Sequence, residues 1–259
     1  MRDSTLKLLP YFTTAMANTE PKTASFRFKQ FTVQQDRCAM KVGTDGIMLG
    51  AWAEVDTAGT ILDIGAGTGI IALMLAQRTS EAKIHGIDID EVACAQASSN
   101  FEAAPWKDRL SIIQESIQDY ARTTRTTYDL IVSNPPFFSG GTFGMKEERA
   151  IARQTVRMPH GDLLIAVRQL LAENGRFCLV LPYLEGLRFQ ERAQEYHLFC
   201  TKVTEVHPRA TMPVNRLLMQ FEQEEKPAVT DQLIIRDNEN EGSYTEAYRE
   251  LLQGFLLKF

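Results

Sequence analysis

Three closely spaced glycines, Gly65, Gly67 and Gly69, separate two apolar segments of different pattern. Residues 60–64 form a short, largely apolar run that is typical of a buried strand, and residues 70–78 have the apolar spacing of a helix. Glycines at such a junction let the backbone turn sharply and leave the first amides of the helix accessible to a ligand. This order predicts an α/β fold with a ligand site at the turn.

Strands and helices continue to alternate after this junction. Four further strands are predicted, at residues 83–88, 110–114, 128–133 and 176–181. Two further helices are predicted, at residues 91–103 and 162–171, the second of them capped by Asp162. Short links between alternating elements indicate a mostly parallel, doubly wound sheet.

The last third of the chain has a different pattern. Three strand-like segments follow one another, at residues 201–206, 216–221 and 232–236. They predict an antiparallel C-terminal addition at one edge of the sheet. Residues 244–258 have the apolar spacing of a closing helix.

The length of the chain and its first residues indicate how it is organised. The chain has 259 residues, enough for one domain with a substantial core. Residues 1–25 are polar and broken by proline, and we interpret them as a flexible N-terminal arm. The remainder, 26–259, is predicted to be a single domain in which residues 26–58 fold over the ligand site.

Charge and cysteine usage exclude several classes of protein. The chain has 28 Lys and Arg against 33 Asp and Glu, a net charge of −5, so a nucleic-acid site would have to be a local basic patch. No apolar run is long enough for a membrane helix, and none of the four cysteines forms a C-x-x-C pair. We therefore expect no membrane association, no metal site and a reducing, cytoplasmic location.

A carboxylate at the end of the second predicted strand is suited to a nucleoside ligand. Asp88 occupies that position and can hold two ribose hydroxyls. Asp90 is the alternative, and we favour Asp88. A dinucleotide-binding fingerprint would need a third glycine at Ile70, so a dehydrogenase is the weakest interpretation.

The sequence Asn134-Pro135-Pro136-Phe137 follows a predicted central strand directly. The prolines restrict the backbone and hold Asn134 at the carboxyl end of the strand. The Asn134 side-chain carbonyl and the Pro135 backbone carbonyl can accept both hydrogens of a planar amino group. Phe137 can stack on a flipped base. The alternative is a rigid proline turn with a core phenylalanine.

The two motifs together carry a resemblance to known enzymes. Residues 63–69, DIGAGTG, resemble the first motif of Rossmann-like S-adenosylmethionine methyltransferases, and NPPF resembles the motif of those that modify planar amino groups. The resemblance implies that Asp63, Gly65 and Gly67 bind the cofactor, together with Asn134. It also implies that an acidic residue after the third strand, here Asp119, binds the adenine of the cofactor.

Further segments resemble one family of these enzymes, the tRNA1(Val) adenine-37 N6-methyltransferases. These segments are residues 28–33, 38–52, 244–248 and 255–259. Within the second of them, Lys41 and Thr44 are expected near the methionine end of the cofactor. The alternative for this segment is a helix that begins at Thr44 or Asp45. The resemblance implies methyl transfer to N6 of an adenine in tRNA.

Other functions stay open at this point. The residues after NPPF, Phe138-Ser139-Gly140-Gly141, lack the histidine usual in ribosomal guanine-N2 enzymes, and glutamine-amide enzymes usually have Tyr where Phe137 stands. Both departures favour adenine over these two alternatives. The non-enzymatic alternative is an RNA-binding module that retains a vestigial cofactor pocket.

A basic segment beside NPPF is a candidate RNA contact. Its cations are Lys146, Arg149, Arg153 and Arg157. The three arginines are four residues apart, so on a helix they would form one stripe suited to phosphate. The alternative is a solvated helix face with internal ion pairs. Weaker candidates lie in other links: Arg122, Arg125, His207 and Arg209.

Overall fold

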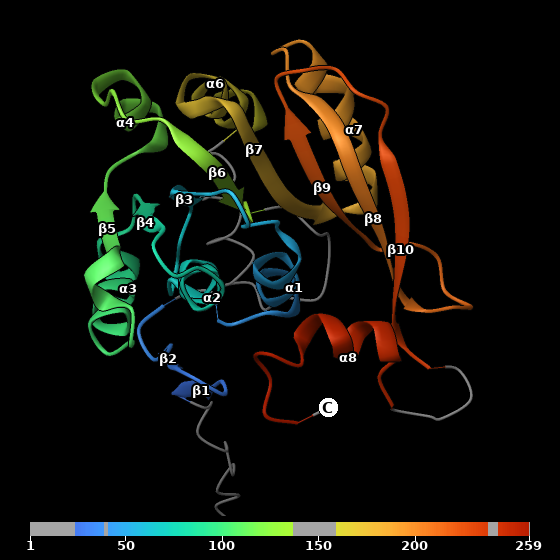
Figure 1. The fold of residues 1–259 in the computed structure, drawn as a ribbon, viewed down its shortest axis with the longest axis horizontal. Helices are drawn as coiled ribbons and strands as arrows, with labels where there is room; N and C mark the ends of the chain where they lie inside the picture. Colours follow the sequence, from blue (N-terminus) through green and yellow to red (C-terminus); the bar gives the residue numbers. More distant parts are fainter. Residues whose placement is uncertain (1–23, 39–40, 137–158, 238–242, 259) are drawn as a thin grey trace, which may run out of the picture.

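The computed structural model describes residues 24–38, 41–136, 159–237 and 243–258. Its centre is an eight-stranded sheet with the order β10-β8-β9-β7-β6-β3-β4-β5, shown in Figure 1. The strands of this sheet are β3 (Thr60–Ile64), β4 (Lys83–Asp88), β5 (Leu110–Gln114), β6 (Tyr128–Ser133), β7 (Leu171–Pro182), β8 (Phe199–Arg209), β9 (Arg216–Glu222) and β10 (Val229–Arg236). A separate hairpin consists of β1 (Ser25–Arg27) and β2 (Thr32–Gln34).

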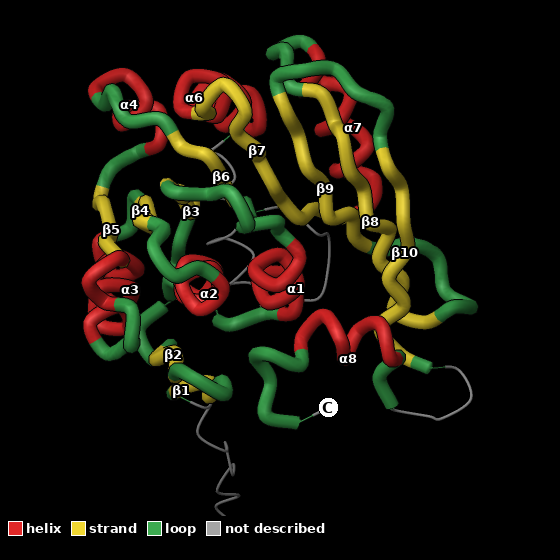
Figure 2. Tube along the Cα trace, viewed as in Figure 1, coloured by secondary structure: helices red, strands yellow, loops and turns green. Residues whose placement is uncertain are grey.

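Helices lie on both faces of the sheet (Figure 2). They are α1 (Thr44–Trp52), α2 (Ile70–Arg78), α3 (Glu91–Glu102), α4 (Ile117–Thr123), α6 (His160–Leu170), α7 (Tyr183–Gln194) and α8 (Glu246–Leu252), with a 3-10 turn at Lys107–Arg109. Helices α1, α2, α3 and α8 pack on one face, and α4, α6 and α7 on the other. Among the described residues, no helix has the length and apolar character to cross a bilayer.

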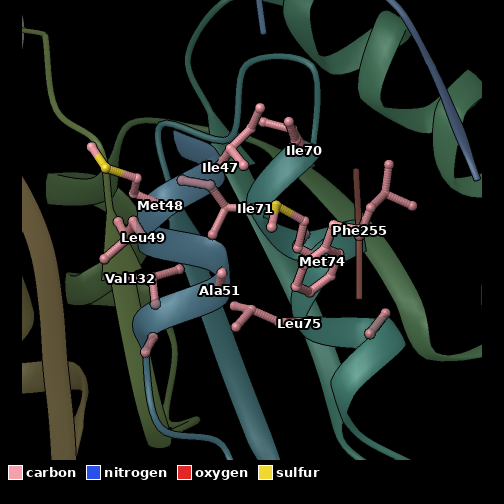
Figure 3. Close-up of a cluster of buried hydrophobic side chains, with 14 of the residues drawn as sticks. Ile47, Met48, Leu49, Ala51, Ile70, Ile71, Met74, Leu75, Val132 and Phe255 are labelled. Carbon is pink, nitrogen blue, oxygen red and sulfur yellow. The ribbon is translucent and has the colours of Figure 1, made fainter. Parts of the chain in front are cut away.

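The parallel part of the fold is confirmed. Strands β3, β4, β5 and β6 and helix α2 have the predicted bounds, and β3 pairs in parallel with both β4 and β6. Helices α1 and α2 pack closely: Ile47 lies near Ile71 (Figure 3), and a Cβ atom on Gly50 would be 2.9 Å from Met74 Sδ. The glycine turn therefore sits on a tightly packed base.

The antiparallel addition is also confirmed, with a detail that the sequence did not predict. Strand β9 runs antiparallel to both β7 and β8, whereas the outermost strand, β10, is parallel to β8. The antiparallel strand thus lies inside the sheet. The closing helix α8 is shorter than predicted. Phe255, just beyond its end, packs in the core near α1 and α2.

Two local predictions were wrong. Asp162 does not cap α6, because Pro159 occupies the N-cap position and Asp162 accepts a hydrogen bond from Gln118 Nε2 at 3.2 Å. Helix α7 was not predicted at all, since only Gly186, Phe189 and Ala193 of its twelve residues are buried. The helical alternative for residues 44–52 is confirmed as α1, with Gly43 rather than a side chain at its N-cap.

Candidate active site

The glycine turn has the backbone conformation that only glycine adopts readily. Gly65, Gly67 and Gly69 have φ values of 73°, 55° and 78°, all left-handed. Gly69 is also the N-cap of α2, and a Cβ atom there would lie 2.4 Å from the Phe101 ring. The turn therefore requires glycine at this residue for two independent reasons, backbone conformation and space.

A cavity of about 290 Å³ opens above this turn, where the carboxyl ends of β3, β4, β5 and β6 converge. Four residues predicted for the site line it: Gly65, Gly67, Asp88 and Asn134. Pro136 lines it as well, next to predicted Pro135. The structure thus brings the two sequence motifs, which are 70 residues apart, to one cavity.

Asp88 is fixed by backbone amides. Its Oδ2 accepts a hydrogen bond from the Gly67 amide at 3.0 Å, and its Oδ1 accepts one from the Asp90 amide at 3.0 Å. Burial raises the pKa of Asp88, while these amide bonds oppose the rise. Asp90 also lines the cavity, but its Oδ1 caps α3 by accepting from the Ala93 amide at 2.9 Å. Asp88 is the carboxylate better placed to hold a diol.

Asp63 lies beneath the turn and does not line the cavity. It is fully buried, and its Oδ2 accepts a hydrogen bond from the Ala72 amide at 3.2 Å, which joins β3 to the first turn of α2. Its Oδ1 has no hydrogen-bond partner among the described residues. Burial, reinforced by the charge of Asp88, raises the pKa of Asp63 to about 7. The carboxyl group supports the turn from below.

Asn134 lines the cavity and has a buried side-chain oxygen without a hydrogen-bond partner among the described residues. The preceding residue, Ser133, is locked by its Oγ, which donates to the Ile64 carbonyl at 2.9 Å. Asn134 Oδ1 is buried and accepts no hydrogen bond from any described residue. Helix α1 lies beside this side chain, since a Cβ atom on Gly46 would be 3.8 Å from Asn134 Nδ2. A buried carbonyl oxygen without a donor is a site for an incoming N–H group.

Apolar residues form the other wall of the cavity, and the sequence analysis missed them. Ile89 and Val92 line it and are 47% and 50% exposed, unusually open for aliphatic side chains that follow a strand. Ile117 and Gln118 line it from α4. Exposed aliphatic residues directly after a buried strand could have been the signal, because they are suited to a planar apolar ligand such as a nucleobase.

The N-terminal segment contributes to the rim of the cavity. Arg37 and Cys38 line it, and the Arg37 amide is held by Gln96 Oε1 of α3 at 3.1 Å. Asn100 of α3 bonds both the amide and the carbonyl of Gln34, at 2.8 and 3.0 Å. Burial and the nearby aspartates raise the pKa of Cys38 to about 11, so its thiol stays protonated at neutral pH.

Several predicted site residues are not brought to the cavity. Asp119 is exposed on α4, where its carboxylate accepts from Ser116 Oγ at 2.7 Å and pairs with Arg122 at 3.0 Å. Lys41 and Thr44 are exposed and do not line the cavity. Some predicted residues lie outside the described part of the chain: Phe137, Lys146, Arg149, Arg153 and Arg157.

Comparisons with known proteins agree with this geometry. The profile of the methyltransferase small domain family matches residues 43–186. A predicted O-methyltransferase from Agrobacterium tumefaciens has a similar fold, with a TM-score of 0.66 over 82% of this chain and 96% of that protein, at 16% identity.

Relatives of much higher identity cover nearly the whole chain. A tRNA1(Val) (adenine(37)-N6)-methyltransferase from Trichodesmium erythraeum is 44% identical over 90% of this chain and 98% of its own length. The enzyme of the same name from Haemophilus influenzae is 45% identical over 90% of this chain and 99% of its own length. The chain therefore belongs to the tRNA1(Val) (adenine(37)-N6)-methyltransferase family.

Proposed function

We propose that the protein transfers a methyl group from S-adenosylmethionine to the N6 atom of adenosine 37 in tRNA1(Val). The observation that carries the proposal is the buried, unpartnered Oδ1 of Asn134 on the wall of the cavity shared with Asp88 and the glycine turn. An amino group entering beside a nucleoside cofactor would satisfy that oxygen. Membership of the family supplies the substrate and the position.

The cavity fits the cofactor. The glycine turn leaves room for close approach of a ligand, because it has no side chains at Gly65 and Gly67, which both line the cavity. The Asp88 carboxylate, fixed by two amides, is placed to accept from the ribose hydroxyls. Ile89, Val92 and Ile117 offer apolar surface to the adenine. When bound, the cofactor supplies an electrophilic methyl group on a sulfonium.

Residues 134–137 are proposed to bind the amino group that accepts the methyl group. The lone pair of an adenine amino group is delocalised into the ring, which makes the nitrogen a weak nucleophile. Asn134 Oδ1 and the Pro135 carbonyl accept its two hydrogens and favour a more pyramidal nitrogen, whose lone pair then points at the methyl group. Alkylation makes the N–H more acidic, so its proton passes to water without a dedicated base. Phe137 is proposed to stack on the flipped adenine.

Binding of the tRNA is assigned to the segment after this motif, and covering of the cofactor to the N-terminal part of the chain. The cations proposed to hold phosphate are Lys146, Arg149, Arg153 and Arg157. Residues 26–58 are proposed to close over the cofactor. The support for this is that Arg37 and Cys38 line the cavity and are anchored through Gln96 on α3.

The test is methylation of an unmodified tRNA1(Val) transcript with methyl-labelled cofactor. The Asn134→Ala variant is expected to lower kcat by about 10²-fold or more, while affinity for S-adenosylhomocysteine changes only a few-fold. Asn215→Ala is the matched control, because that asparagine is exposed at the start of β9. Full turnover by Asn134→Ala, or labelling of ribosomal RNA or a protein in place of the transcript, would contradict the proposal.

A further inference from the structure

Four arginines lie along the outer part of the same sheet edge, beyond the acceptor motif. Arg209 and Arg236 are register partners at the carboxyl ends of β8 and β10. Arg216 begins β9, opposite the last residue of β7. Arg188 lies on α7, which follows β7. We call these four residues the arginine edge.

The arginine edge lies on the same side of the sheet as the active site and extends beyond it: Ser133 is level with Val203 of β8, and Arg209 lies six residues further along that strand. Strands β6, β7, β8 and β10 all run in the same direction, so their carboxyl ends share one edge with Asn134. Strand spacing is about 4.8 Å, which places β8 and β10 roughly 14–19 Å from β6. Phosphates recur every few ångströms along a nucleic-acid strand, so a duplex that places one base at Asn134 brings phosphates to this edge.

Two members of the edge are held by other parts of the protein. The Arg236 guanidinium stacks on the Tyr244 ring at 4.4 Å, and Tyr244 stacks in turn on Tyr248 at 5.0 Å. Arg236 Nη2 also donates to Tyr244 Oη at 3.3 Å, so this guanidinium is held in place at the end of β10. Arg216 pairs with Asp45 of α1 at 2.9 Å, which ties the edge to the helix beside Asn134.

The other two members face outward. Arg188 is exposed and Arg209 is partly exposed, and neither forms an ion pair with a described residue. A carboxylate of α7, Glu185, lies close enough to Arg188 and Arg216 to feel their charge. On a chain of net charge −5, four arginines along one edge of the sheet are a local exception that suits an anionic partner.

We infer that the arginine edge binds the phosphate backbone of the substrate tRNA outside the nucleotide that is methylated. The inference rests on the proposed function for the identity of the RNA. Arg188 and Arg209 contact phosphates directly, and Arg236, held by Tyr244, adds positive charge beside them. Phosphate contacts of this kind position the RNA and add affinity that is independent of sequence.

The test measures binding of the unmodified tRNA1(Val) transcript to the full chain by fluorescence anisotropy, at several salt concentrations. The double variant Arg188→Gln/Arg209→Gln is expected to bind about tenfold more weakly at low salt. The slope of log K against log salt is expected to fall by about 1.5, because two phosphate contacts are lost. In turnover, KM is expected to rise with kcat nearly unchanged.

Two controls keep the result specific. Arg168→Gln removes an exposed arginine from the last turn of α6, just before β7 begins, at the opposite edge of the sheet, and is expected to bind like wild type. Arg188→Lys/Arg209→Lys keeps both charges and is expected to retain most of the salt slope. Wild-type affinity and slope in the glutamine double variant, or no binding of the transcript by the wild type, would overturn the inference. Binding without methylation would overturn only the proposed function.

Discussion

The two halves of the sheet hold their polar groups in different ways. Around the cofactor cavity, carboxylates are fixed by backbone amides, as Asp88 is by Gly67 and Asp90. Around the added strands, side chains hold one another across long stretches of sequence, as Arg216 and Asp45 do. The first arrangement ties the pocket carboxylates to the backbone, and the second ties the added strands to α1 through an ion pair between side chains.

The largest loss of stability is expected at the glycine turn, where Gly69 has no space for a side chain. Gly69→Ala puts a Cβ at 2.4 Å from the Phe101 ring in a residue with φ of 78°. Left-handed strain and overpacking together are expected to lower the free energy of unfolding by about 2–5 kcal/mol. Gly67→Ala is the matched control, because the nearest atom is 4.0 Å away and only the strain applies. Urea unfolding measures both, and equal losses would contradict the packing argument.

The buried carboxyl group under the turn is expected to make stability depend on pH. Burial raises the pKa of Asp63 from 3.8 to about 7, so between these values the folded state binds more protons than the unfolded chain. The contribution of Asp63 to the free energy of unfolding therefore falls as pH rises from 4 to 7, by roughly 2–4 kcal/mol.

Asp63→Asn has no group that titrates in this window. We expect the free energy of unfolding of this variant, measured in urea from pH 4 to 7, to increase relative to that of the wild type as pH rises. Parallel curves for the two proteins would show that Asp63 is charged in the folded state throughout.

Two carboxylates near the ends of adjacent strands, Asp88 and Asp119, are expected to differ in their contribution to cofactor affinity. Asp88→Asn is expected to weaken binding of S-adenosylhomocysteine about 10–100-fold, because a charged acceptor at the ribose is lost. Asp119→Asn is the control and is expected to change affinity less than about twofold, since its carboxylate is exposed and paired with Arg122. Calorimetric titration distinguishes them. A large effect at Asp119 would restore it as an adenine ligand.

The smallest loss of stability is expected for the ion pair that joins the added strands to α1. Asp45→Asn removes the ion pair with Arg216, in which the two side chains are 20% and 26% exposed. The free energy of unfolding is expected to fall by less than about 1 kcal/mol, and the loss should shrink at high salt. A loss as large as that of Gly69→Ala, measured in the same urea titration, would break the contrast between the two halves.

Local sequence was sufficient to predict the half of the sheet that forms the cofactor cavity. Strands β3 to β6 and helix α2 are apolar runs bounded by turn residues, and the site residues Gly65, Gly67, Asp88 and Asn134 follow them immediately. Elements that depend on distant partners were not predictable. Helix α7 has few buried side chains, and its Gly186 packs where a Cβ would be 2.9 Å from Leu217 Cδ1.

Two polar residues, Asp162 and Asp119, show the same limit. Asp162 has the spacing of a helix cap, yet it accepts from Gln118, 44 residues away. Asp119 follows a strand as a nucleoside ligand would, yet it completes the capping turn that begins at Ser116. In both cases a local pattern was compatible with two roles, and the neighbouring helix decided between them.

The central claim is methyl transfer to N6 of adenosine 37 in one valine tRNA. The most direct measurement is mass spectrometry of nucleosides and mapped fragments from purified tRNA1(Val), taken from cells with and without this protein. The account predicts that N6-methyladenosine at position 37 disappears without the protein and returns with the wild type but not with Asn134→Ala. N6-methyladenosine that persists at position 37 in cells lacking the protein would contradict it.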